Sequence, residues 1–200
     1  MRPEANITRA ETAAVLFRLL SDPNKGSYLE SMFSDITDDL WYAQSVKYLT
    51  SNGIIQGYPD GTFRGDSMIT RAEFATLIAK FDMLEFTDDN AFPDIVSHWA
   101  FEYINSSAAK GWVIGYPNGE FRPEAYLRRA EIVTAINNML LRAIMPEDIP
   151  DWAPNYNDID LDHWAYANII EASVGHEFQR KLYGYEIWIQ LLSWQPVLES

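Results

Sequence analysis

The chain has 200 residues, a formal net charge of −14 and no cysteine, and 48% of its residues are hydrophobic. That hydrophobic content suits a folded core, and the absence of cysteine excludes disulfides, thiolate catalysis and Cys-ligated zinc. A surface this acidic repels nucleic acid and anionic lipid, so we expect neither nucleic acid nor a membrane as a partner. No run of apolar residues has the length of a transmembrane helix.

The chain begins inside a unit that recurs along the sequence. Copies of its most conspicuous segment are Ile7–Glu11, Ile69–Glu73 and, more loosely, Leu127–Glu131. The arginines of these copies lie 62 and 58 positions apart, which predicts repeated units that pack on their neighbours. Because Arg2–Ala5 matches Arg122–Ala125, we expect the chain to be a fragment that starts in the middle of a repeat.

Each copy of this segment predicts the start of a helix. Thr8 and Glu11 have the spacing of a capping box, as do Thr70 and Glu73. In the third copy Arg128 replaces the threonine, so we expect that box to be broken. Apolar residues with helical spacing follow at Ala10, Ala14, Phe17 and Leu20, at Ala72, Ala75, Ile78 and Phe81, and at Ala130, Val133, Ile136 and Leu140.

A second helix is predicted in each unit, after an aromatic-x-Asp-Ile motif and a tryptophan. The motifs are Phe33–Ile36, Phe92–Ile95 and Tyr156–Ile159, and the tryptophans are Trp41, Trp99 and Trp164. Trp99, Tyr103, Ile104 and Ala108 have the spacing of a buried helical stripe. The first two of these helices are predicted to end at Gly53 and Gly111, which suit a left-handed exit.

Two similar loops, Gly57–Phe63 and Gly115–Phe121, connect these helices to the next arginine-bearing helix. Their Pro-Asp-Gly and Pro-Asn-Gly sequences favour tight turns. We expect each loop to complete a groove beside the arginine that follows it. On that expectation Arg9 lacks its loop, and the groove of Arg71 binds best.

These elements, occurring in this order more than once, resemble the S-layer homology repeat over residues 2 to about 173. The resemblance implies an all-α fold, a pseudo-threefold spindle of three helix pairs around a central helix bundle. It also implies non-covalent attachment of exported proteins to a pyruvylated secondary polymer of the Gram-positive cell wall. The implied location is therefore extracellular and associated with the cell wall, and self-association in a surface layer is a further partner interaction.

The resemblance divides the chain into a repeat array at 1–175 and a tail at 176–200. The array comprises a partial repeat at 1–32, full repeats at about 33–91 and 92–155, and a partial repeat at 156–175. The tail departs from the repeat pattern and is similar to the tails that close some family members. We therefore expect these repeats to end a longer parent protein whose effector region lies upstream, although the fragment itself has no signal peptide.

The candidate ligand-binding residues recur at equivalent positions of the units. They are Arg9, Arg71 and Arg129, Asp35, Asp94 and Asp158, Trp41, Trp99 and Trp164, and Gly57 and Gly115. A guanidinium at a helix N-terminus opposes the helix dipole, yet with the free N–H groups there it suits a carboxylate such as that of a pyruvyl ketal. The alternatives are salt bridges from the arginines to the motif aspartates, capping or Asx-turn aspartates, core tryptophans and turn glycines.

Other chemistry has little support in the sequence. No catalytic motif is present, and the three histidines include no pair at metal-ligand spacing. We therefore assign no catalytic residue, no metal ligand and no cofactor. The alternative to a glycan-binding anchor is a structural module that assembles a surface lattice without binding glycan. A third class, an enzyme such as a glycan hydrolase, is favoured by no residue pattern.

Overall fold

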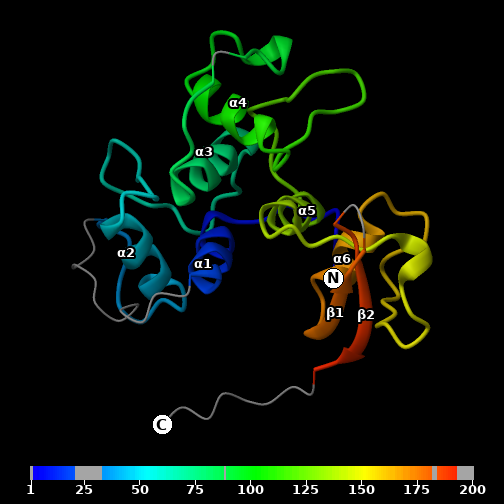
Figure 1. Cartoon of the computed structure of the whole chain (residues 1–200). Helices are drawn as coiled ribbons and strands as arrows, with labels where there is room; N and C mark the ends of the chain where they lie inside the picture. The colour runs from blue at the N-terminus through cyan, green and yellow to red at the C-terminus, as the bar shows by residue number, and fades with distance from the viewer. Residues whose placement is uncertain (1, 21–32, 88, 182–183, 193–200) are drawn as a thin grey trace. The chain divides into compact units, whose positions relative to one another are not determined.

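Helices account for most of the regular structure in the computed structural model, which describes residues 2–20, 33–87, 89–181 and 184–192. The chain divides into two units, residues 6–127 and residues 1–5 with 128–200 (Figure 1). Parts of the predicted partial repeat 1–32 and of the predicted tail 176–200 thus lie outside the described residues. Within the described part of the chain, no helix combines the length and hydrophobicity needed to cross a membrane.

The unit of residues 6–127 contains two helix pairs. Helix α1 (Arg9–Leu19) packs with α2 (Ala43–Ser51), and α3 (Arg71–Phe81) packs with α4 (Phe101–Ala109), which follows the 3₁₀ turn η1 (Pro93–Ile95). Each arginine-bearing helix therefore pairs with the next tryptophan-associated helix. The α3–α4 core contains Ala72, Ala75, Ile95, Ala100, Ile104 and Phe121, in which small side chains let the two helices approach closely.

Local signals in the sequence fix the ends of these helices. The N–H of Glu11 donates to Thr8 Oγ1 at 3.1 Å, and the N–H of Thr8 donates to Glu11 Oε2 at 2.9 Å. Thr70 and Glu73 form the same pair of bonds at the start of α3, so both predicted capping boxes are confirmed. Gly53 and Gly111 have φ values of 72° and 71°, which confirms their predicted left-handed conformation after α2 and α4.

A closed ring of backbone hydrogen bonds links equivalent positions of the three repeats. The N–H of Ile69 donates to the carbonyl of Ile7, that of Leu127 to Ile69, and that of Ile7 to Leu127, over 2.9 to 3.1 Å. All three side chains are buried. The ring belongs to the unit of residues 6–127 and fastens the segments that precede the arginine-bearing helices.

The other unit contains the third helix pair, α5 (Arg129–Met139) with α6 (Tyr166–Glu171), and the 3₁₀ turn η2 (Pro146–Asp148). Its tail forms an antiparallel hairpin of β1 (His176–Arg180) and β2 (Glu186–Leu191), so the all-α prediction is wrong for the tail. Strand β2 alternates Glu186 and Trp188, which are buried, with exposed Ile187 and Ile189. Such alternation, with β-branched residues, favours a strand over a helix.

The third capping box is half retained. The N–H of Arg128 donates to Glu131 Oε2 at 2.8 Å, but a guanidinium cannot accept the return bond. The side chain of Arg128 instead pairs with Glu4. The expectation of a broken box therefore holds only for its threonine half.

The tryptophans do not belong to the buried stripes predicted for them. Each lies before the first residue of its helix, and Trp41 and Trp99 are 65% and 61% exposed. Ile104 is buried as predicted, but the assignment of Trp99 to that stripe is wrong. The helical spacing of apolar residues extends to Trp99, but Trp99 lies in the turn two residues before α4 begins at Phe101.

Candidate functional site

Arg9 joins the start of α1 to the loop that follows α2. Its Nε donates to the carbonyl of Phe63 at 2.9 Å, and Nη2 donates to that of Gln56 at 3.3 Å. Nη1 pairs with Glu73 Oε1 at 2.8 Å, and the guanidinium carbon lies 4.8 Å from the centre of the Tyr58 ring. Only 8% of Arg9 is exposed, so this cation is largely buried while it connects α1 to the loop and to Glu73.

Arg71 has the equivalent surroundings one repeat later. Its Nε donates to the carbonyl of Phe121 at 2.8 Å, and Nη2 donates to that of Ile114 at 2.7 Å. The guanidinium lies 4.8 Å from the centre of the Tyr116 ring, and 6% of the residue is exposed. Both arginines thus contact the loop that follows them in the chain, so the prediction that the preceding loop serves each arginine is wrong.

Arg129 cannot have the same surroundings. Its backbone N–H donates to the carbonyl of Ala5 at 2.9 Å, as the equivalent N–H groups of Arg9 and Arg71 donate to Ser67 and Ala125. The sequence after Trp164, however, contains no Gly-Tyr-Pro loop. The residue is partly exposed, in contrast to the two buried arginines.

The predicted aspartates hold the loops rather than the arginines. Asp35 accepts hydrogen bonds from the backbone N–H groups of Phe63 and Arg64 at 2.8 and 2.7 Å. Asp94 accepts from Phe121 and Arg122 at 2.9 and 2.7 Å. Burial opposes the ionisation of Asp94, but these two N–H groups and the charge of Arg71 bring its pKa below the usual value.

The residue that each aspartate holds has a left-handed backbone. Arg64 and Arg122 have φ values of 59° and 57°, a conformation that is unfavourable for a residue with a long side chain. In the other unit Asp158 accepts from the N–H of Arg2 at 2.6 Å, and Arg2 has a φ of 48°. The motif aspartate therefore stabilises the same strained position in all three copies.

Gly57 and Gly115 are required by close packing rather than by a left-handed turn. A Cβ atom on Gly57 would lie 2.3 Å from a ring carbon of Phe33, and one on Gly115 would lie 2.5 Å from a ring carbon of Phe92. The two phenylalanines open the aromatic-x-Asp motifs. Ring, glycine and aspartate therefore hold each loop in place together.

A groove opens beside Arg9 on the unit of residues 6–127. It has a cavity volume of about 560 Å³, with Arg9, Tyr58, Glu73, Lys80 and Trp99 among its lining residues. A second hollow of about 460 Å³ shares Tyr58, Glu73 and Trp99 with it. We call the two together the Arg9 groove. The larger cavity combines the cations Arg9 and Lys80 with the carboxylate of Glu73, and Glu124 adds a second carboxylate in the smaller hollow. Charged groups beside aromatic rings suit a sugar that carries a negative charge.

The exposed indole of Trp99 lies beside a histidine that is itself paired with a glutamate. The ring of His98 lies 5.4 Å from that of Trp99, and His98 Nε2 lies 2.7 Å from Glu124 Oε1. Glu124 itself lines the second hollow. In the other unit His163 and Trp164 repeat this arrangement with Glu4, at 2.8 Å from His163 Nε2.

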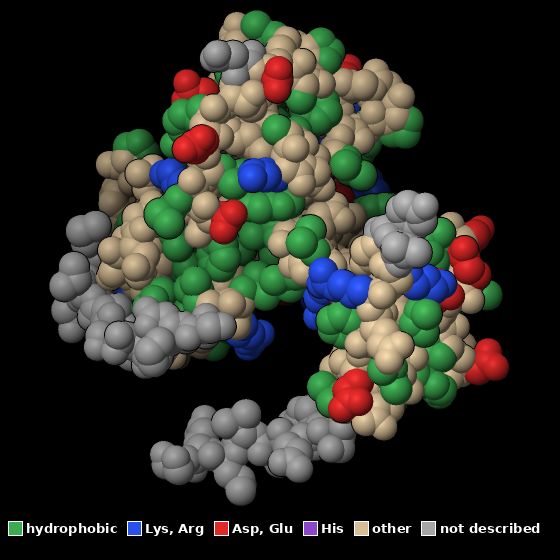
Figure 2. Space-filling view, in the orientation of Figure 1, with side chains coloured by type: hydrophobic (Ala, Val, Ile, Leu, Met, Phe, Trp, Pro, Cys, Tyr) green, Lys and Arg blue, Asp and Glu red, His purple; other side chains and the backbone are tan. Residues whose placement is uncertain are grey.

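The acidity of the chain is not concentrated in one place on the face drawn in Figure 2. There the acidic side chains are dispersed among hydrophobic and polar ones. The larger cavity of the Arg9 groove is lined by two cations, Arg9 and Lys80. Burial lowers the pKa of Lys80, whose ammonium lies 5.7 Å from the centre of the Tyr103 ring.

Sequence reasoning missed several residues of the groove. Tyr58 and Glu73 were assigned only to a turn and to a capping box, although each also faces Arg9. Their recurrence as Tyr116 and Glu131 was the available signal. A buried polar cluster in the hairpin unit, formed by Glu171, His176 and Glu186, was also missed because its members share no recognisable spacing.

The family model described as the S-layer homology domain matches residues 33–75 and 91–133. A cellulosome-anchoring protein of Acetivibrio thermocellus is 39% identical over 199 residues, covering 96% of this chain and 44% of that protein. Cell surface glycoprotein 1 of the same organism is 38% identical over 191 residues, covering 88% of this chain and 8% of that protein. A surface layer protein of Brevibacillus choshinensis is 35% identical over 107 residues, covering 50% of this chain and 9% of that protein.

Each family match begins at an aromatic-x-Asp motif and ends within an arginine-bearing helix. The matched segment therefore contains the tryptophan, its helix and the Gly-Tyr-Pro loop. The chain spans less than half the length of each of these relatives.

Proposed function

We propose that this chain, which belongs to the S-layer homology family, attaches an exported protein to the bacterial cell surface by binding a polysaccharide of the cell wall. The names of its relatives, a cellulosome-anchoring protein, a cell surface glycoprotein and a surface layer protein, support a role at the cell surface. The chain itself binds and does not catalyse.

The observation that carries the glycan proposal is the presence of an exposed indole and a buried guanidinium in one groove. Trp99 offers an apolar face on which a sugar ring can stack. Within the described residues, three of the five N–H donors of Arg9 are engaged, and the other two are proposed to bind a ligand carboxylate. Glu73 and Tyr58 can exchange hydrogen bonds with sugar hydroxyls.

An anionic wall polymer fits this lining better than a neutral one. In the larger of its two cavities, Arg9 and Lys80 place two positive charges against the carboxylate of Glu73, whereas Glu124 lines the smaller hollow and pairs with His98. A pyruvyl ketal carries one carboxylate, which the planar guanidinium can bind in bidentate fashion. The Arg71 site has equivalent internal contacts and is proposed as a second place of binding, whereas Arg129, without a following loop, is proposed as weak or silent.

The finer architecture is also a proposal. The ring of backbone hydrogen bonds among Ile7, Ile69 and Leu127, together with three helix pairs, supports a pseudo-threefold spindle around a central bundle. We propose a repeat array at 1–175, in which the matched segments are its best preserved parts, followed by the tail at 176–200.

A pull-down on purified wall sacculi tests the proposed function. The chain should sediment with intact sacculi and remain in solution after chemical removal of the secondary polymer. Unchanged sedimentation on stripped sacculi would contradict binding to that polymer. The alternative, a lattice module without glycan binding, predicts oligomers in sedimentation velocity that grow with protein concentration and need no wall material.

A further inference from the structure

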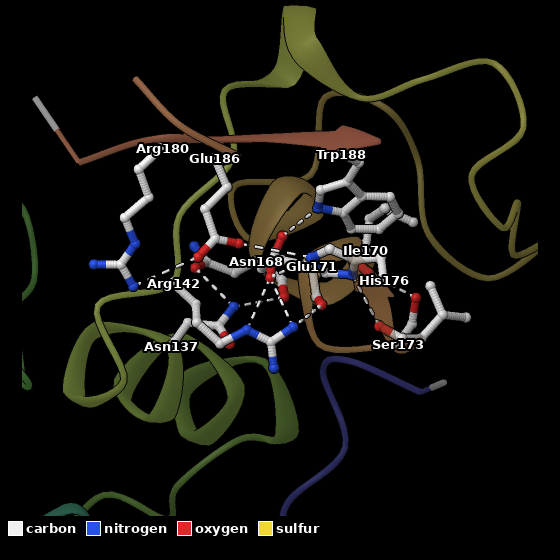
Figure 3. A network of polar contacts seen from close by, with 11 residues as sticks. Asn137, Arg142, Asn168, Ile170, Glu171, Ser173, His176, Arg180, Glu186 and Trp188 are labelled. Carbon is white, nitrogen blue, oxygen red and sulfur yellow. Dashed lines mark hydrogen bonds and ion pairs between the residues drawn. The ribbon is translucent and has the colours of Figure 1, made fainter. Parts of the chain in front are cut away.

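Three buried side chains from three elements converge beneath the C-terminal hairpin (Figure 3). Glu171 is the last residue of α6, His176 is the first of β1 and Glu186 is the first of β2. Each is more than nine-tenths buried. One potential ligand atom from each lies within 4.8 Å of the other two.

Glu171 is fully satisfied by hydrogen bonds to neighbouring donors. Its Oε1 accepts from Arg142 Nε at 2.9 Å and lies 2.8 Å from Arg142 Nη2. Its Oε2 accepts from Trp188 Nε1 at 2.7 Å. This carboxylate is therefore fixed in orientation, as the supporting bonds of a metal-bound carboxylate would fix it.

Nε2 of His176 and the carboxylate of Glu186 accept no such hydrogen bonds from the described residues. His176 Nδ1 lies 3.0 Å from the carbonyl of Val174, to which it must donate because a carbonyl only accepts. In the neutral ring, Nε2 is then a lone pair, 3.2 Å from Glu171 Oε1 and 3.6 Å from Glu186 Oε2. Among the residues that the structure describes, neither Nε2 nor either oxygen of Glu186 has a hydrogen-bond partner. Three electron-rich atoms thus face one another, an arrangement that needs a cation between them.

The geometry fits a metal ion better than a proton. A proton shared by Glu186 and His176 would have to span 3.6 Å, which is beyond hydrogen-bonding distance. Glu171 lies closer, but its oxygen stands too far from the direction of the Nε2–H bond to accept it. Ligand atoms around a common tetrahedral zinc ion are separated by about 3.4 Å, so oxygens to the side of the Nε2 direction are in the expected positions.

We propose that Glu171, His176 and Glu186 bind a divalent transition-metal ion of the zinc class, which fastens the C-terminal hairpin to α6. One imidazole and two carboxylates suit such an ion better than calcium or magnesium, which prefer shells of oxygen. The Nδ1 bond to Val174 supplies the second-shell contact usual for a ligating histidine. Both oxygens of Glu186 are available, so this residue can supply one or two of the ligand atoms.

The nearby cations limit the affinity without preventing binding. Arg142 neutralises Glu171, and Arg180 Nη2 lies 3.7 Å from Glu186 Oε1 at the edge of the cluster. Arg180 is largely exposed, which makes its removal a useful probe.

The test is calorimetric titration of the chelator-treated, untagged 200-residue chain with zinc chloride, accompanied by thermal unfolding. We expect one ion per chain and a rise in Tm of roughly 5–10 °C at a zinc concentration about 100 times the Kd. Cobalt(II) should give the visible absorption of a low-coordinate site. Glu186→Gln should abolish the high-affinity step, yet without metal it should melt at or above the wild-type temperature because it removes a buried negative charge.

His163→Gln is the matched control, since this histidine pairs with Glu4 outside the cluster and its loss should leave zinc binding unchanged. Arg180→Gln should tighten binding about 10-fold or less, since it removes a screened positive charge. The proposal is overturned by three results: no saturable binding, binding that survives Glu186→Gln and His176→Gln, or ¹⁵N NMR that shows a protonated His176 unaffected by zinc.

Discussion

The arginines that begin α1 and α5 occupy the same position in the repeat but have different surroundings. Arg9 is buried between the carbonyls of a following loop and the carboxylate of Glu73. Arg129 is partly exposed, and the sequence that follows its partner helix has no such loop. The surroundings of Arg9 come from the loop and the helix that follow in the chain, so a copy of the arginine motif without such a loop does not reproduce them.

The largest expected difference between these positions is in stability. Arg9→Ala should lower the free energy of unfolding by about 2–4 kcal/mol, because two carbonyls and the Glu73 carboxylate lose this donor in a largely buried place. Arg129→Ala should cost about 1 kcal/mol or less. Urea unfolding of both variants measures the difference, and equal losses would show that the two arginines have equivalent roles.

The loop that distinguishes the two positions should be sensitive to a single methyl group. Gly57→Ala should destabilise the chain by about 1–3 kcal/mol, because its Cβ would collide with Phe33 and the carbonyl of Thr62. Gly53→Ala is the matched control, since no atom lies within 4 Å of its Cβ and only its positive φ is unfavourable, at about 1 kcal/mol. A Gly57 variant as stable as the wild type would mean that the loop moves freely.

Glycan binding should separate two tryptophans that are equally exposed. Trp99→Ala should weaken binding to the wall polymer about 10-fold or more, because the indole lines the Arg9 groove. Trp41→Ala should have a smaller effect, since Trp41 is not among the lining residues of that groove. Both variants should keep the wild-type melting temperature within a few degrees. Calorimetry with a short anionic wall glycan compares them, and an equal loss would remove the distinction.

The smallest effect concerns pH and the aspartate that holds the second loop. Asp94→Asn should cost about 1 kcal/mol at neutral pH, because two backbone N–H groups lose a charged acceptor. The pKa of Asp94 in the folded chain lies below the usual 3.8, so the stabilisation is complete above that value and is lost as the pH falls through the folded pKa. The stability difference from the wild type should therefore shrink in acid, and a gap that widens there would contradict this role.

Much of the repeat could be predicted from local signals. The helix starts at Thr8 and Thr70 and the exits at Gly53 and Gly111 depend only on residues close in sequence. The partner of each arginine could not be predicted in this way. Arg9 contacts Phe63 and Glu73, which lie 54 and 64 positions away in the sequence. No local sequence signal indicates which of the distant residues the guanidinium contacts.

The tail was harder to predict for a different reason. Its hairpin brings Glu171, His176 and Glu186 together through a strand pairing that no repeat foreshadows. The alternation in Glu186–Leu191 is present in the sequence, but these residues match no part of the repeat that would indicate what they pair with. Likewise, the hydrophobic character of Trp41 and Trp99 favoured a core position, which a binding function can override.

The central claim, that the Arg9 groove binds an anionic wall glycan, is tested most directly by NMR of the tryptophan indole N–H signals during titration with a short pyruvylated glycan. The account predicts that the signal of Trp99 shifts saturably and more than that of Trp41. A saturable shift of Trp41 with Trp99 unmoved, or no shift of either at concentrations where sacculi retain the chain, would contradict it.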